Sequence, residues 1–364
     1  MSSTPDSKEG QQETSLDIIK KIDKEAMLEA VENFPHQAKE AIEIADKAPL
    51  EIKVDKPRAV VILGMGGSGI SGDVTKALLE EELKVPVVVN KGYLLPSWVD
   101  EKTLCFAVSY SGDTEETLAG FEEANRRGAK IILLTSGGKL AQMAAQFNLP
   151  LIKIPVGLQP RASLGYLSLP IVVTLHRLGL IENKEKDFAE MLGILSKKVK
   201  EWGGKKPLET NQAQLLAMRI HGKLPIVYGS DGITALAALR WKCQFNENSK
   251  IPTFFGVFPE LNHNETVGWQ LLEETTQKFC LILLRDAFEH PRIKKRIEIT
   301  REIVAKQFGD VLEIHSSGES LLARLFSLIY LGDFLSVYLA ILSGVDPTPV
   351  EKVNILKKKL AETN

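Results

Sequence analysis

The chain has 364 residues and a formal net charge of −2, with 44% hydrophobic and 25% charged residues. This composition is typical of a soluble globular protein with two domains of ordinary size, and it excludes a disordered or fibrous chain. Such a small net charge gives no broad basic field for binding nucleic acid or an anionic membrane. Any anion that the protein binds must therefore be held at a local site.

The sequence shows neither a targeting segment nor a motif for metal binding. The polar start MSSTPDSKEGQQETS is not a signal peptide, and no run is expected to span a membrane, so we expect a cytoplasmic protein. Cys105, Cys243 and Cys280 form no CxxC pair and are expected to be reduced core residues. The histidines form no HxH or HExxH pair, so we expect no metal and no cofactor.

The chain begins with a polar stretch and a helical region. Residues 1–14 lack apolar periodicity and are predicted to be a disordered tail. Residues 16–48 carry apolar side chains at helical spacing, and this segment is expected to pack on the strands and helices that come after it.

From residue 58 onward, short apolar runs alternate with amphipathic segments. The first half contains AVVILGM, VPVVV, LCFAVS, KIILLT and LPLIKI, with one helix expected to begin near Ser71; the second half contains LPIVYGS, PTFFGVF, FCLILLR and VLEIH. This pattern predicts an α/β protein with two doubly wound parallel sheets flanked by helices. Because GGKKP is a plausible linker, we expect one domain over 15–203, including the leading helix, and another over 204–364.

The glycine-rich turn after the first strand, GMGGSG at residues 64–69, fits the pattern GxGxxG. A dinucleotide site would also need an acidic residue at the end of the second strand, but that strand ends in Asn90 and Lys91. A P-loop would need a lysine where Ile70 stands. The glycines alone indicate only a tight turn between a strand and a helix.

A second turn, SYSGDTEET, changes this interpretation. Ser109, Ser111 and Thr114 bring hydroxyl groups to the start of a helix, where unpaired backbone N–H groups favour an anion, and Ser68 adds a hydroxyl from the first turn. Turns of this kind meet at the carboxyl ends of parallel strands. A plain helix cap is the alternative for one such turn. Two turns together favour a phosphate monoester site.

Candidate catalytic groups stand mainly in the second half. Glu247 follows an apolar helix within FNENSK, and His263 lies beyond the next strand, which is expected to be buried, within ELNHNE. Arg161 follows Pro160 in a fixed loop, where a guanidinium could stabilise a developing oxyanion. Taken singly, a solvated helix end, a surface histidine or a surface ion pair would explain each of them. A carboxylate and a histidine near a phosphate site fit acid–base chemistry on a sugar phosphate.

At these residues the chain resembles the bifunctional phosphoglucose/phosphomannose isomerase family, which is built from two sugar isomerase (SIS) domains. The resemblance runs from about residue 60 to the C-terminus and is carried by GMGGSGISGD, SYSGDTEET, PRASLGYL, RWKCQFNENSK, ELNHNE and GVDPTPVEKVNILKKKL. It implies an isomerase that interconverts glucose 6-phosphate and mannose 6-phosphate with fructose 6-phosphate through an enediol(ate). It also implies a cytoplasmic homodimer with shared active sites, in which the partner donates His263.

The resemblance assigns roles to individual residues. Glu247 would move the proton between C1 and C2, Arg161 would stabilise the intermediate, and His263 with Lys357 would open the sugar ring. Lys358 and Lys359 are alternatives to Lys357. Thr348 would make room for both epimers at C2. The phosphate would be held by Gly66, Gly67, Ser68, Ser109, Ser111 and Thr114.

Two other functions fit a protein with SIS domains. A sugar-phosphate sensor would bind its ligand without turnover, and it usually carries a DNA-binding or partner domain, for which the chain has no basic helix-turn-helix candidate. A ketose-phosphate aminotransferase would need a supply of ammonia, and the chain has no N-terminal nucleophilic cysteine. Both fit the sequence less well than an isomerase.

Overall fold

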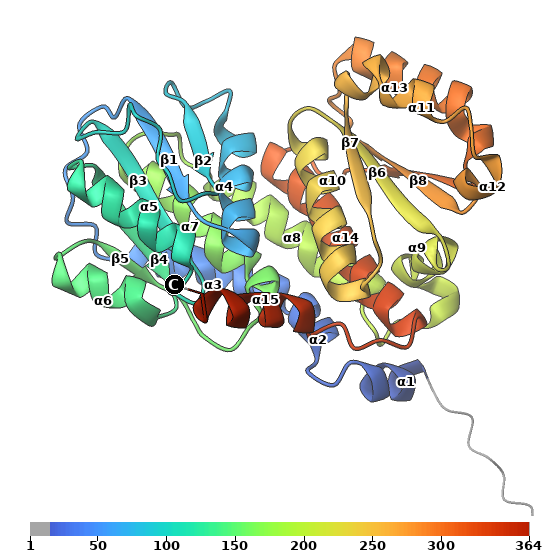
Figure 1. The fold of residues 1–364 in the computed structure, drawn as a ribbon, viewed down its shortest axis with the longest axis horizontal. Coiled ribbons are helices and arrows are strands. Elements are labelled where there is room, and N and C mark those ends of the chain that lie inside the picture. The colour runs from blue at the N-terminus through green and yellow to red at the C-terminus, as the bar shows by residue number, and fades with distance from the viewer. Residues whose placement is uncertain (1–14, 364) are drawn as a thin grey trace, which may run out of the picture.

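The two parallel sheets predicted from the sequence are both present. The computed structural model describes residues 15–363, so the tail expected over residues 1–14 lies outside the described residues. Each sheet forms the centre of one lobe, with helices covering its faces (Figure 1). The α/β fold class is therefore confirmed.

The first sheet has five parallel strands in the order β2-β1-β3-β4-β5. Every residue of β1 and β3 is buried, as expected for central strands that helices cover on both faces. The strands are β1 (Ala59–Leu63), β2 (Val87–Asn90), β3 (Thr103–Ser109), β4 (Lys130–Thr135) and β5 (Leu151–Lys153). Its helices are α4 (Gly66–Leu79), α5 (Glu115–Arg126), α6 (Gly138–Gln146) and α7 (Leu164–Arg177).

Helix α4 begins at Gly66, so the prediction that this helix starts near Ser71 is wrong. Gly66 has a φ of +52°, which a glycine adopts readily and which lets the chain turn directly from strand to helix. Gly66, Gly67 and Gly69 therefore lie within the helix, and only Gly64 lies before it.

The N-terminal helical region consists of three helices, α1 (Ser15–Ile22), α2 (Met27–Glu32) and α3 (Phe34–Lys47). Asp23 interrupts it, because its carboxylate accepts hydrogen bonds from the backbone N–H groups of Met27 and Leu28, both at 2.8 Å. Helix α3 packs on α7, which confirms that this region packs against the first lobe.

The second sheet has four parallel strands in the order β7-β6-β8-β9. Strand β7 lies at its edge, with Phe254 57% exposed and Phe255 37% exposed, so the expectation of a buried strand there is wrong. The strands are β6 (Leu224–Ser230), β7 (Phe254–Phe258), β8 (Phe279–Arg285) and β9 (Asp310–His315). The longer helices around it are α9 (Gln212–Ile220), α10 (Ile233–Gln244) and α13 (Pro291–Val304), and α8 (Glu185–Trp202) connects the first lobe to them in the chain.

Short elements complete the chain. They are α11 (Glu265–Gly268), α12 (Glu273–Thr276), the 3₁₀ turns η1 (Pro160–Ala162), η2 (Leu208–Thr210), η4 (Glu260–His263) and η5 (Ala305–Gln307), and the π-helical turn η3 (Phe245–Ser249). The domain boundary predicted after residue 203 falls between α8 and α9, with one sheet before it and the other after it. That boundary stays a prediction.

Helix α14 (Leu321–Leu342) forms the core that both lobes share, and α15 (Glu351–Ala361) follows it. Every residue of α14 from Leu322 to Ala340 is buried, and the helix packs against α8, α9, α10 and α2 (Figure 1). By length and composition α14 could cross a membrane, but 89% of its apolar window is buried inside the protein. It is a core helix.

A buried ion pair fixes α14 against α10. Arg240 donates to the two carboxylate oxygens of Asp333 at 3.0 and 2.8 Å, and Gln244 donates to the same carboxylate at 2.9 Å. The side chains of Arg240 and Asp333 are 3% and 6% exposed. Arg240 also donates to the backbone carbonyl of Arg161 at 2.9 Å. The core is therefore linked directly to a candidate catalytic residue.

The variant Asp333→Ala should lose about 3–5 kcal/mol of unfolding free energy, because it leaves the Arg240 guanidinium buried without its carboxylate. Urea denaturation measures this loss. The control is Asp310→Ala, which breaks the more exposed ion pair with Arg219 and should cost about 0–1 kcal/mol. Equal losses in both variants would contradict a structural role for the buried pair.

Candidate active site

The first candidate phosphate turn is the N-terminus of α4. The residue before the helix, Met65, has an extended backbone, and no side-chain hydrogen bond from it caps the helix. The first N–H groups of a helix have no partner within the helix. Gly66 is exposed, so those groups face a surface that an anion can reach.

The second turn lies next to the first, as the sequence predicts, because β1 and β3 are neighbours in the sheet. The hydroxyl of Ser68 accepts a hydrogen bond from the backbone N–H of Tyr110 at 3.1 Å, which ties the two turns together. Ser109 and Thr114 share a hydrogen bond of 2.9 Å, while Ser111 is exposed. Thr114 precedes α5 but makes no side-chain capping bond to it. Ser111 and Asp113, the residues that could form a plain helix cap, accept hydrogen bonds from the backbone N–H groups of Asp113 and Lys139 at 3.3 and 3.0 Å, which lie outside α5.

Close backbone contacts hold the two turns in place. A Cβ on Gly112 would lie 1.9 Å from the carbonyl oxygen of Gly137, and Gly112 has a φ of +77°. A Cβ on Gly67 would lie 2.7 Å from the carbonyl oxygen of Pro160. The first phosphate turn therefore packs directly against the turn that carries Arg161.

Arg161 is 4% exposed, and its guanidinium joins the two lobes. Its Nε donates to the side-chain oxygen of Asn248 at 2.6 Å, and its Nη2 donates to the carbonyls of Pro347 and Thr348 at 3.0 and 2.7 Å. Burial lowers the pKa of Arg161, while the negative charge of Glu247 opposes that shift. These hydrogen bonds hold the loop that carries Arg161 in place, as the sequence predicts.

Glu247 faces this guanidinium, with 3.9 Å between its Oε2 and Nη1 of Arg161. Its side chain is 40% exposed, so one carboxylate lies between a buried cation and solvent. It stands in η3, where α10 widens into a π-helical turn, a feature frequent at functional sites. Asn248 in the same turn donates to Ser336 of α14 at 2.9 Å. The turn is thus anchored in the core.

A groove of about 620 Å³ opens beside Glu247. Lys250 lines it and was not identified from the sequence; its ammonium donates to the carbonyls of Glu247 and Pro347 at 2.5 and 3.0 Å, and burial lowers its pKa. Thr348 is buried nearby, and its hydroxyl finds no hydrogen-bond partner within residues 15–363. No local motif in the sequence distinguishes Lys250 from a surface lysine.

His263 and Lys357 do not join this group of residues within one chain. His263 is exposed on η4, after the carboxyl end of β7, whereas Glu247 precedes that strand, so the length of β7 separates them. Lys357, Lys358 and Lys359 are exposed on α15. Across residues 15–363, no hydrogen bond or ion pair links His263 or Lys357 to Arg161 or Glu247.

The three cysteines form no disulfide bond. Cys105 and Cys280 are buried and Cys243 is half-buried, so Cys243 is less of a core residue than expected; all three are free thiols. In the described part of the chain, no three His, Cys, Asp or Glu side chains are grouped to hold a metal ion. The candidate site therefore consists of hydroxyl, amide, carboxylate, ammonium and guanidinium groups.

Two family models match the chain. Residues 53–154 match the SIS domain, and residues 209–360 match the bacterial phospho-glucose isomerase C-terminal SIS domain. The crystal structure of a hypothetical protein from Thermus thermophilus superposes with a TM-score of 0.69 at 18% identity, covering 95% of this chain and 93% of that one. At that identity the superposition supports the fold alone.

Two relatives match most of the chain. A bifunctional phosphoglucose/phosphomannose isomerase from Caldicellulosiruptor bescii is 45% identical over 92% of this chain and 99% of its own length. One of the same name from Aquifex aeolicus is 40% identical over 83% of this chain and 90% of its own length. With this identity and coverage, the chain belongs to the bifunctional phosphoglucose/phosphomannose isomerase family.

Proposed function

We propose that this isomerase interconverts glucose 6-phosphate and mannose 6-phosphate with fructose 6-phosphate through an enediol(ate) intermediate. The observation that carries the proposal is the apposition of Glu247 and the buried Arg161 at 3.9 Å, beside the phosphate turns. The relatives from Caldicellulosiruptor bescii and Aquifex aeolicus, which bear the name of this activity, support it.

The substrate phosphate binds at the two turns. The first N–H groups of α4, at Gly66 and Gly67, point their dipole at an anion, and the exposed hydroxyl of Ser111 donates from the second turn. The hydroxyls of Ser109 and Thr114 bind each other, and that of Ser68 binds the backbone N–H of Tyr110, so these three side chains shape the site. Each hydroxyl can still form a further hydrogen bond to the ligand. Donors of this kind suit a single phosphate group.

Glu247 moves the proton between C1 and C2. Its half-exposed carboxylate can reach the substrate, and removal of a proton next to a carbonyl puts negative charge on the carbonyl oxygen. Arg161 lies beside it with a guanidinium that stays charged and is fixed by three hydrogen bonds, so it stabilises that oxygen without reorganising. The two residues therefore divide the base and oxyanion roles.

Ring opening and tolerance of both epimers complete the proposal. Because His263 lies beyond the length of β7 from Glu247 in one chain, we assign it to the active site of a second copy, in a cytoplasmic homodimer. Lys357 on the exposed helix α15 acts with it. We assign the accommodation of both epimers at C2 to Thr348, whose buried hydroxyl has no hydrogen-bond partner within the described residues. Nucleic acid and membranes are not partners.

Wild-type protein should convert fructose 6-phosphate to both aldose 6-phosphates in the presence of a chelator. Glu247→Gln should lower kcat by roughly 10²–10⁴-fold, because the amide cannot accept the proton. Coupled assays for glucose 6-phosphate and mannose 6-phosphate measure both rates, and calorimetry with a non-reacting phosphate monoester should show unchanged binding.

The matched control is Glu351→Gln, since Glu351 lines the same groove without contacting Arg161. It should keep wild-type activity. Near-normal turnover by Glu247→Gln would show that the base is another residue. Binding of fructose 6-phosphate by the wild type without turnover would instead favour a sugar-phosphate sensor.

His263→Ala and Glu247→Gln should each be nearly inactive alone, yet a refolded mixture of the two should regain part of the activity. In a mixed dimer one site combines the intact Glu247 of one chain with the intact His263 of the other. Activity that stays at the level of the two separate variants would contradict shared active sites.

A further inference from the structure

The second sheet repeats the strand order of the first around its central strands. The order β7-β6-β8-β9 corresponds to β2-β1-β3-β4, and in both sheets the third strand has seven residues. The last pair between the third and fourth strands is Ser109 with Thr135 in one sheet and Arg285 with His315 in the other. Arg285 therefore holds the place that Ser109 holds in the phosphate site.

The turn at the end of β6 keeps the backbone of a phosphate turn. Gly64 and Gly229 hold matching places in the two sheets. Gly64 follows Leu63, which pairs with Ala107, two residues before the end of β3. Gly229 follows Tyr228, which pairs with Leu283, two residues before the end of β8. A Cβ on Gly64 would lie 3.0 Å from the Ser68 carbonyl, and one on Gly229 would lie 2.3 Å from the Thr234 carbonyl. Both turns require a glycine so that the following helix can pack this close to the strand end.

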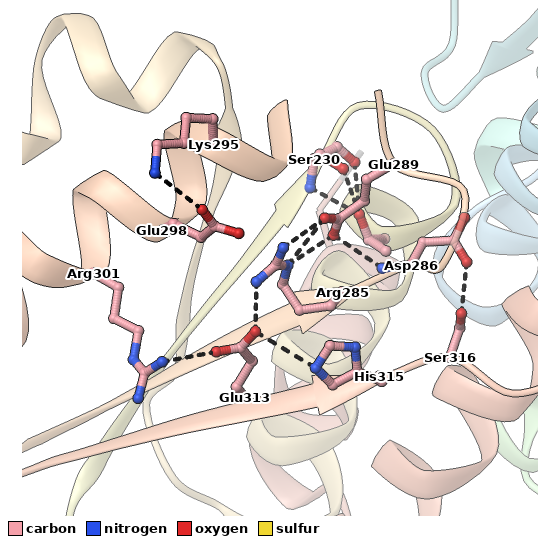
Figure 2. A network of polar contacts seen from close by, with 11 residues as sticks. Ser230, Arg285, Asp286, Glu289, Lys295, Glu298, Arg301, Glu313, His315 and Ser316 are labelled. Atoms are coloured by element: carbon pink, nitrogen blue, oxygen red, sulfur yellow. Dashed lines mark hydrogen bonds and ion pairs between the residues drawn. The ribbon is translucent and has the colours of Figure 1, made fainter. Parts of the chain in front are cut away.

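A carboxylate occupies the strand ends of the second lobe. Glu289 accepts hydrogen bonds from Nε of Arg285 at 2.9 and 3.1 Å and from its Nη2 at 2.8 Å. It also accepts one from the backbone N–H of Asp286 at 2.9 Å. Both side chains are almost fully buried, at 6% and 3% exposed, and Figure 2 shows Glu289 pointing onto Arg285 at the end of β8.

In the first lobe, the backbone N–H group at the position that corresponds to Asp286 has a different partner. There Tyr110, which follows β3 as Asp286 follows β8, donates to the hydroxyl of Ser68. In the second lobe, the backbone N–H of Asp286 and the guanidinium of Arg285 both donate to the carboxylate of Glu289, which is an anion of the protein itself. The donor set, an N–H at a strand end plus a guanidinium fork, is one that also binds phosphate.

The surroundings leave room for an external anion to reach Arg285. Its remaining partner is Glu313, at 2.5 Å from Nη1, which also binds Arg301 at 3.2 Å (Figure 2). An open groove of about 410 Å³ is lined by the cations Arg285, Lys294 and Arg301 and by the carboxylates of Glu298, Glu302 and Glu313. Without Glu289, the Arg285 guanidinium would have one carboxylate where it now has two.

We propose that the second lobe contains a degenerate phosphate site that Glu289 closes as a built-in anion. The chain therefore holds phosphate only in its first lobe, and removing the Glu289 carboxylate opens a second site for a phosphate group at Arg285. This inference rests on the proposed phosphate site of the first lobe, but not on the proposed isomerisation chemistry.

The test compares Glu289→Ala with wild type by calorimetric titration with inorganic phosphate and by thermal unfolding in phosphate against chloride at equal ionic strength. The variant should bind one more phosphate per chain than the wild type, and phosphate should raise its Tm by more. If the first-lobe site failed, the wild type would bind none and the variant one, so the two proposals fail separately.

Two further variants complete the test. Glu298→Ala removes the same charge from an exposed ion pair on the rim of the same groove and should bind no additional phosphate. The double variant Arg285→Met with Glu289→Leu removes both charges and should be insensitive to phosphate at this site. Equal binding by Glu289→Ala and the wild type would overturn the proposal, as would a variant that stays insoluble in both phosphate and chloride.

Discussion

A buried guanidinium must have its donors satisfied, and the candidate site is organised around meeting that requirement for Arg161. An unpartnered charge in the interior costs several kcal/mol, so the acceptors around it cannot be dispensable. They come from distant parts of the chain: the side chain of Asn248 and the carbonyls of Pro347 and Thr348. The hydrogen bonds of the Arg161 guanidinium therefore hold η3 and the segment before α15 against the first lobe.

The same requirement reaches the core and the phosphate turns. Arg240, held by Asp333 of α14, donates to the carbonyl of Arg161, so the core helix fixes the backbone of the residue whose side chain faces Glu247. On the other side, the absence of a Cβ at Gly67 lets the first phosphate turn approach this loop closely. In the proposed mechanism, phosphate binding, oxyanion stabilisation and proton transfer would thus share one rigid support, which keeps their distances fixed.

Local patterns were enough to predict the two sheets and the adjacency of the phosphate turns, because strand runs and glycine-rich turns are local signals and parallel topology brings strand ends together. They did not reveal the Arg240–Asp333 pair or the contact of Lys250 with Pro347, because these partners lie far apart in the chain. The sequence also misled at β7, because an apolar run does not show that a strand lies at the edge of its sheet. His263 and Lys357 were assigned by resemblance, and one chain does not unite them with Glu247.

Proton transfer through an enediol(ate) can be tested directly by isomerising fructose 6-phosphate in deuterated water and analysing both aldose products by NMR. The account predicts deuterium at C2 of a share of the glucose 6-phosphate and of the mannose 6-phosphate, because the proton held by a half-exposed Glu247 can exchange with solvent. Products that carry no deuterium at C2 would indicate direct hydride transfer and would contradict the assignment of Glu247 as the base.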